Sequence, residues 1–145
     1  ALVISTGIVR SVPNTRDALD ASKPYDLYAG SSAWLKLNTP ENSLIFQTDW
    51  DDFPRLFFYN THNTYLIGLD PTYMQIYDPG LYNLWTQITR GQINNPSRMI
   101  LDKFGTRYIH SDLKHDEFLA IAEKDSGLKE VYRDSDSVIF EVILP

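Results

Sequence analysis

The chain has 145 residues, of which 43% are hydrophobic, and it carries a formal net charge of −6. This length and apolar content favour one folded domain with a substantial core over a disordered chain. The acidic charge and the scattered Lys and Arg residues argue against a nucleic-acid partner, because a phosphate backbone is itself negative. The absence of Cys excludes disulfides, thiolate metal sites and a cysteine nucleophile.

An apolar stretch that is too short to cross a membrane opens the chain. Residues 1–12 are interrupted by Ser, Thr, Gly and Arg, whereas a membrane-spanning helix needs about 20 mainly apolar residues. The chain also begins with Ala rather than Met. We therefore expect residues 1–24 to lead in from a membrane span that precedes them, and residues 25–145 to form a single α/β domain.

Helical and extended patterns alternate in the first half of the chain. Pro24 opens a helix in which Leu27, Trp34 and Leu35 share one side, and the apolar run LIF that follows a turn predicts a buried strand. In chain order, the predicted elements are helices 14–21 and 24–37, strand 43–48, helix 54–59 and strand 64–68.

The second half begins with stronger helix signals. Asp78 followed by Pro predicts the start of a helix that carries Trp85 and Ile88 on its apolar side and ends at Gly91. The segment DSDS between the last two apolar strands predicts a β-hairpin. In chain order, the predicted elements are a helical turn at 70–77, helices 79–90 and 96–104, strand 107–110, helix 112–125 and strands 128–133 and 138–144.

This order of elements predicts the fold class. Strands that alternate with helices favour a parallel sheet with right-handed crossovers and helices on both faces. The terminal hairpin adds antiparallel strands at one edge. We predict a three-layer α/β sandwich with a mostly parallel core sheet and a C-terminal antiparallel hairpin.

Polar residues follow three of the predicted strands. In an open parallel sheet, ligands bind beyond the carboxyl ends of the strands, so Asp49 or Asp51, Asp70 and His110 are candidates to converge in one cleft. Carboxylate ligands of this kind suit Mg²⁺, Ca²⁺ or Mn²⁺, and Mn²⁺ also accepts His.

Helix capping offers a simpler explanation of the same residues. Asp49, Asp70 and Asp112 each precede a predicted helix, where Asp is a favoured N-cap, and Asp51 and Asp52 are then exposed to solvent. We prefer this explanation, because capping alone accounts for the spacing, and we expect no metal or cofactor in this domain. His62 and His115 are expected at exposed positions, without the spacing of metal ligands.

No complete catalytic motif occurs in the chain. A Gly-rich phosphate loop after the first strand and a Gly-x-Ser-x-Gly elbow are both missing. Trp34 and Trp85 occupy helix positions that face the core. Trp50, in contrast, lies in a polar loop beside three carboxylates, a composition that suits the stacking and hydrogen bonding of a sugar. A lid over the core is the simpler explanation of such a ring, and we prefer it on the composition alone.

Four short motifs give the chain a family resemblance. They are AWLKLNTP at 33–40, DWDDFP at 49–54, YLIGLDP at 65–71 and FGTRYI at 104–109. Their order resembles the extracytoplasmic C-terminal domains of multi-spanning membrane glycosyltransferases that use lipid-linked sugars, of the dolichyl-phosphate-mannose and oligosaccharyltransferase type. In oligosaccharyltransferases, a Trp-Trp-Asp-Tyr-Gly stretch in this place helps to hold the acceptor sequon. Here the stretch keeps one Trp followed by Asp and lacks the second Trp, the Tyr and the Gly, which argues against sequon recognition.

The resemblance implies an accessory, periplasmic domain of an integral membrane protein. Such a domain is non-catalytic alone, its partners are the transmembrane part of the same polypeptide and a glycan or protein acceptor, and a divalent metal belongs to the parent enzyme. The residues that would contact acceptor or ligand are Asp49, Trp50, Asp51, Asp52 and Asp70. Two other hypotheses stay open: a free-standing hydrolase or metal-dependent enzyme that uses the acidic strand ends, and a protein-interaction module.

Overall fold

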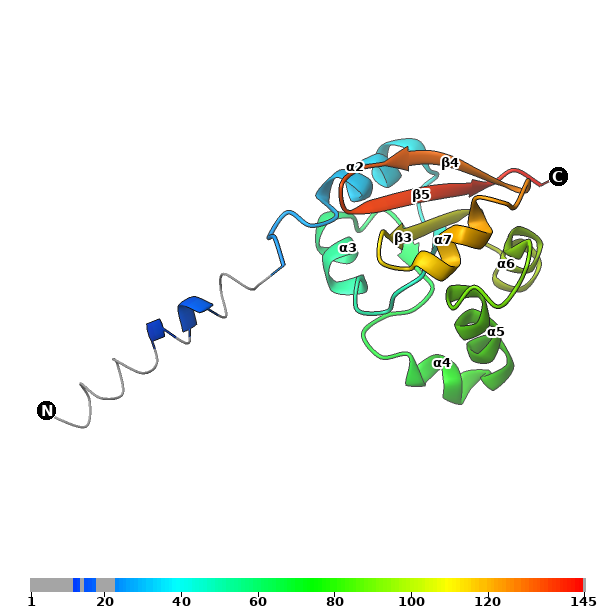
Figure 1. Cartoon of the computed structure of the whole chain (residues 1–145), viewed down its shortest axis with the longest axis horizontal. Helices are drawn as coiled ribbons and strands as arrows, with labels where there is room; N and C mark the ends of the chain where they lie inside the picture. Colours follow the sequence, from blue (N-terminus) through cyan, green and yellow to red (C-terminus); the bar gives the residue numbers. More distant parts are fainter. Residues whose placement is uncertain (1–11, 14, 18–22, 145) are drawn as a thin grey trace, which may run out of the picture.

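A five-stranded mixed sheet with helices on both faces forms the domain (Figure 1). The computed structural model describes residues 12, 13, 15–17 and 23–144. The strands are β1 (Leu44–Gln47), β2 (Thr64–Tyr65), β3 (Tyr108–Asp112), β4 (Leu128–Arg133) and β5 (Ser137–Val142). The helices are α2 (Ala29–Asn38), α3 (Phe53–Tyr59), α4 (Thr72–Tyr77), α5 (Pro79–Thr89), α6 (Pro96–Phe104) and α7 (Asp116–Ala122).

The strand order is β2-β1-β3-β5-β4. β1 pairs in parallel with β2 and β3, whereas β5 pairs antiparallel with β3 and forms the terminal hairpin with β4. The predicted α/β class, with a parallel centre and an antiparallel hairpin, is therefore confirmed.

β2 is shorter than predicted because a side chain replaces part of its ladder. The Gln47 amide oxygen accepts hydrogen bonds from the backbone N–H groups of Leu66 and Ile67, and its NH₂ group donates to the Ile67 carbonyl. These bonds continue the connection between the two strands after Tyr65. The same buried amide holds the start of the loop that leads to Asp70.

Several predicted helices have other boundaries. α2 begins at Ala29 rather than Pro24, because Tyr28 has a left-handed backbone with φ of 68°, which interrupts the helix. α7 begins at Asp116, since Asp112 is still the last residue of β3. Most of the predicted helix 14–21 lies outside the described residues.

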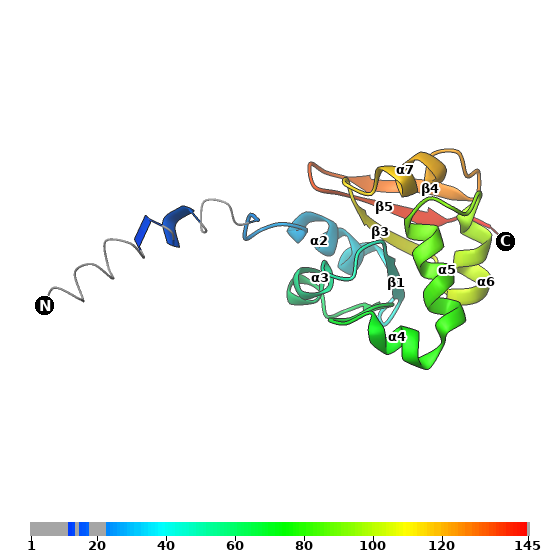
Figure 2. The ribbon, with the colours of Figure 1, turned by 60° about the horizontal axis from the view of Figure 1, so that its bottom comes forward.

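The two faces of the sheet are covered by different helices. Phe46, Ile109 and Phe140 face α5, α6 and α7 in the larger apolar cluster, whereas Ile45 and Ile139 pack with Leu35 of α2 on the other face. Figure 2 shows α2 and α3 on one side of the sheet and α5 and α6 on the other. The carboxyl ends of β1 and β3 therefore emerge between two helical layers.

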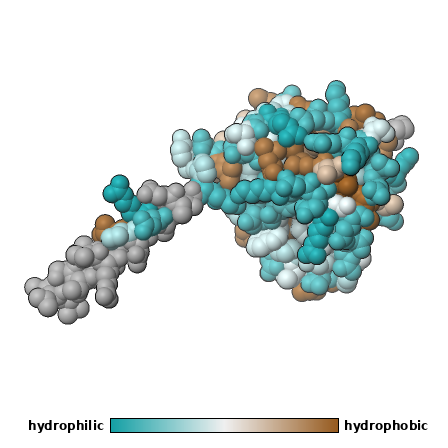
Figure 3. All heavy atoms as spheres, viewed as in Figure 1, coloured by the Kyte–Doolittle hydropathy of each residue, from teal (hydrophilic) through white to brown (hydrophobic). Residues whose placement is uncertain are grey.

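The surface seen in Figure 3 is mostly hydrophilic, with a hydrophobic area in the upper half of the domain and a smaller one at the bottom, where α4 lies. Tyr73, Ile76 and Tyr77 of this helix are exposed. Within the described part of the chain, no helix is both long and apolar enough to span a bilayer.

Candidate functional site

The register of β1 and β3 brings two aspartates together at the carboxyl edge of the sheet. Gln47 pairs with His110 in the parallel ladder, and one residue further on the Thr48 hydroxyl donates to the Ser111 hydroxyl at 3.0 Å. Asp49 and Asp112 each lie two residues after the paired Gln47 and His110, and they therefore leave the sheet at the same level.

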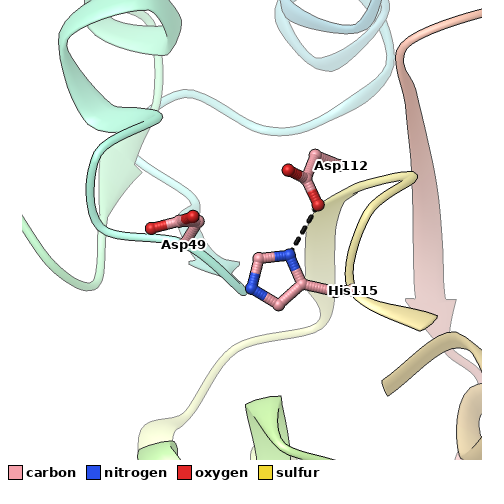
Figure 4. Close-up of side chains that lie close together, drawn as sticks. All are labelled: Asp49, Asp112 and His115. Carbon is pink, nitrogen blue, oxygen red and sulfur yellow. Dashed lines mark hydrogen bonds and ion pairs between the residues drawn. The ribbon is translucent and has the colours of Figure 1, made fainter. Parts of the chain in front are cut away.

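His115 completes a group of three polar side chains at this edge. Its Nδ1 lies 2.5 Å from an Asp112 carboxylate oxygen, and Figure 4 shows Asp49 to the left of the imidazole ring and Asp112 to its right. One potential ligand atom from each of Asp49, Asp112 and His115 lies within 4.8 Å of the other two. Among the described residues, this is the one group of three or more His and acidic side chains so arranged.

The Asp112–His115 contact favours an ion pair. The hydrogen bond to Asp112 raises the pKa of His115 despite the opposing effect of burial, and the charges of Asp112, Asp49 and Asp52 add to the rise. Burial acts to raise the pKa of Asp112, but the hydrogen bond and charge of His115 outweigh it, so the pKa of Asp112 is lowered. The side chains are 23% and 11% exposed, so water screens the pair only in part.

Asp52 is buried beside this group rather than solvated, which corrects the sequence expectation. It is 1% exposed, and neither carboxylate oxygen has a hydrogen-bond partner. Burial raises its pKa to about 7; the nearby Tyr28 hydroxyl acts in the opposite direction, and the charges of Asp112 and Asp49 add to the rise. An uncompensated carboxylate of this kind is costly to bury.

A cleft of about 600 Å³ opens beside the group. The loop after β1, the end of α5 and the start of α7 supply its walls, which include Thr48, Asp49, Trp50, Trp85, Arg90 and His115. Trp50 is 41% exposed, whereas Trp85 is 6% exposed and donates its indole N–H to the Gln47 carbonyl at 3.0 Å. Trp50 is therefore the accessible ring, and Trp85 belongs to the core, as the sequence predicted.

The other predicted site residues lie elsewhere. Asp70 is exposed, and its carboxylate accepts hydrogen bonds from the Thr72 backbone and hydroxyl at 2.9 and 2.7 Å. Asp51 is exposed and lies 3.7 Å from the Lys23 ammonium. The expected convergence of Asp70 with the other acidic residues is not observed, because Asp70 lies outside the group formed by Asp49, Asp112 and His115.

His110 does not face the cleft either. It is fully buried, with Nε2 3.2 Å from the Ser31 hydroxyl and its ring edge-on to Tyr28 at a centroid distance of 5.0 Å. Burial lowers its pKa to about 4, against the opposing charges of Asp112 and Asp134. His110 is a neutral core residue on the α2 face.

The predicted capping role is also corrected. The side chains of Asp49, Asp70 and Asp112 each accept a hydrogen bond from the backbone N–H two residues later, which closes a local turn before the helix. None of the three is the N-cap of α3, α4 or α7. Asp78, in contrast, caps α5 by accepting from the Leu81 N–H at 3.0 Å.

The pairing of His115 was missed at the sequence level. His115 had been expected on an exposed helix, but it lies in the turn before α7, where its side chain is held by Asp112. The available signal was the Asp-x-x-His spacing directly after a buried strand. That spacing places the two side chains on the same side of a tight turn.

Comparison of the chain with models of known protein families gives no match, and comparison with curated proteins gives none either.

Proposed function

We propose that this domain is an accessory part of a membrane glycosyltransferase that uses lipid-linked sugars, and that it contacts a glycan or an acceptor without catalysing transfer itself. On this proposal, the domain lies on the periplasmic face of the membrane, and its partner is the transmembrane part of the same polypeptide. The order of the four motifs at 33–40, 49–54, 65–71 and 104–109 supports the assignment.

The exposed ring of Trp50 at the mouth of the cleft is the observation that carries the proposal. Sugars are held when an apolar ring face stacks on an aromatic side chain while planar polar groups bind the hydroxyls. Trp50 is 41% exposed, and Asp49, Arg90 and Gln92 line the same cleft. This combination favours a glycan as the occupant.

The polar side-chain pairs of the described residues support a domain that binds without catalysing a reaction. The Ser31 hydroxyl and the His110 imidazole are 3.2 Å apart, as in a nucleophile and its base, but both side chains are fully buried. His115 lines the cleft, and Asp112 holds its imidazole as the orienting carboxylate of a catalytic base would. In the described part of the chain, however, no Ser or Thr hydroxyl is hydrogen-bonded to His115. A nucleophile within reach of the base is therefore missing from that arrangement.

The test is a binding titration of the chain with a panel of oligosaccharides and short acceptor peptides, in the presence of a chelator. We expect a glycan to shift the Trp50 indole signal in ¹H–¹⁵N NMR spectra, and we expect Trp50→Ala to abolish glycan binding measured by calorimetry. Tyr73→Ala is the control, because Tyr73 is an equally aromatic side chain, 75% exposed, on α4.

Two results would count against the proposal. If neither a glycan nor a peptide perturbs Trp50, the cleft has no role in recognition. If the isolated chain turns over a generic ester, phosphate or glycoside and loses this activity on Asp112→Asn, the chain is a free-standing hydrolase.

A further inference from the structure

A second feature of the carboxyl edge lies in the same cleft as Trp50. Asp49 and Asp112 come from the ends of two neighbouring parallel strands, and His115 comes from the turn before α7. Their potential ligand atoms lie within 4.8 Å of one another. Two ligands on opposite sides of one ion, each about 2.1 Å from it, are about 4 Å apart, so only a small contraction brings all three onto one ion.

We infer that Asp49, Asp112 and His115 bind a divalent metal ion that accepts both oxygen and nitrogen ligands, Mn²⁺ or Zn²⁺. Two carboxylates with one imidazole suit these ions better than Ca²⁺ or Mg²⁺, which favour oxygen ligands alone. The inference departs from the sequence expectation of no metal in this domain. It also stands without the glycosyltransferase proposal, because none of its observations depends on a glycan or a lipid-linked sugar.

The imidazole is already oriented for such a role. Nδ1 of His115 lies 2.5 Å from an Asp112 oxygen, so two of the three potential ligand atoms are already adjacent, and an ion that binds both would replace the proton between them. The hydrogen bond from the Asp51 N–H at 3.2 Å likewise steadies the Asp49 carboxylate.

Asp52 gives an independent indication that a positive charge belongs here. Its carboxylate is 1% exposed and makes no hydrogen bond of normal geometry to another described residue, and the Tyr28 hydroxyl is the one donor among these residues near enough to lower its pKa. It is close enough to Asp49, Asp112 and His115 to interact electrostatically with each of them. A buried carboxylate without a partner is expensive, and a divalent cation at the neighbouring group would offset that cost.

Arg90 lines the same cleft as Asp49 and His115, but few basic side chains pair with the carboxylates themselves. Asp49, Asp52 and Asp112 are three carboxylates, and His115 is the one basic side chain among the described residues that forms an ion pair with any of them. Lys23 pairs with the neighbouring Asp51 at 3.7 Å instead. Because His115 is neutral when it binds a metal, one divalent ion would offset two of the three carboxylate charges.

The test measures binding of MnCl₂ and ZnCl₂ to the 145-residue chain by calorimetry, and locates Mn²⁺ by paramagnetic broadening in ¹H–¹⁵N NMR spectra. We expect one ion per chain, with broadening centred on residues 49–52 and 112–115. Asp49→Asn, Asp112→Asn and His115→Gln should each weaken binding at least about 10-fold. Each Asn keeps the oxygen that closes the local turn, so the fold is preserved.

Asp70→Asn is the matched control. Asp70 follows β2 at the same edge and closes the same kind of turn, but it lies outside the group, so this variant should bind the ion as the unaltered chain does. The inference is overturned if neither ion binds at 1 mM, if Asp70→Asn weakens binding as much as the other variants, or if the broadening centres on another acidic segment. If Asp112→Asn does not fold, the other two variants decide.

Discussion

Asp49 and Asp112 stand side by side at the carboxyl edge of the sheet, two residues beyond the paired Gln47 and His110 of β1 and β3. Their proximity follows from parallel pairing in one particular register, because a shift by one residue would turn one of the two side chains to the other face of the sheet. His115 is drawn to this pair by its hydrogen bond with Asp112.

The Asp112–His115 pair leads to a prediction for the metal-free chain. Asp112→Asn should lower the pKa of His115, because the hydrogen bond to the carboxylate is the largest cause of its rise. An NMR titration of the imidazole signals in the presence of a chelator measures the change. The signals of His62, which binds the Thr39 carbonyl on the other side of the domain, serve as the internal reference. An unchanged His115 titration would contradict the ion pair.

Asp52 and His110 should affect stability with opposite dependence on pH. The folded-state pKa of His110 is about 4, below its ordinary value of 6.5, so the unfolded chain binds the extra proton and stability is lost as the pH falls from 6.5 to 4. A shift of this size corresponds to roughly 3 kcal/mol. The folded-state pKa of Asp52 is about 7, above 3.8, so stability is lost as the pH rises from 4 to 7.

Denaturant unfolding at several pH values separates the two effects. Relative to the unaltered chain, His110→Gln should gain stability as the pH falls from 6.5 to 4. Asp52→Asn should gain stability as the pH rises from 4 to 7. If the difference in free energy of unfolding from the unaltered chain changed with pH in the same direction for both variants, one of the two groups would not titrate as its burial implies.

Replacing Trp50 should have little effect on the fold. Its ring is 41% exposed, so Trp50→Ala should lower the free energy of unfolding by about 1 kcal/mol or less. Trp85→Ala removes a ring that is 6% exposed and hydrogen-bonded to Gln47, and should lower it by roughly 3–5 kcal/mol. Thermal and denaturant unfolding of both variants give the comparison. A large loss in Trp50→Ala would make this ring a structural lid.

Replacing Asp125 should lower the free energy of unfolding more than replacing an ordinary helix cap does. This residue is 5% exposed, and its carboxylate accepts hydrogen bonds from the Ser97 N–H, the Ser97 hydroxyl and the Gly127 N–H at 2.8, 2.9 and 2.8 Å. Asp125→Ala leaves these donors unpaired and should lower the free energy of unfolding by roughly 3 kcal/mol.

Asp78→Ala is the comparison for this variant. Asp78 caps α5 through one hydrogen bond, and its loss should cost about 1 kcal/mol. Equal losses measured by denaturant unfolding would mean that the Asp125 contacts contribute no more than a single cap.

The local sequence by itself determined most of the elements and the class of the fold. The apolar run in β1, the Asp-Pro start of α5 and the polar segment before β5 are short-range signals, and each of them acts within a few residues. The alternation of such elements then limits the sheet to a parallel centre with an antiparallel hairpin. The exposed position of Trp50 in a polar loop was predictable for the same reason.

The tertiary structure alone decided which side chains meet. Asn95 precedes α6 but makes no side-chain cap, and Asp125, which is distant in sequence, supplies that contact. Asp52 is polar and follows two other acidic residues, yet packing of α3 against α2 leaves it buried. His115 and Asp49 are brought together by strand register. These outcomes depend on contacts between residues far apart in the chain, and local propensity carries no information about such contacts.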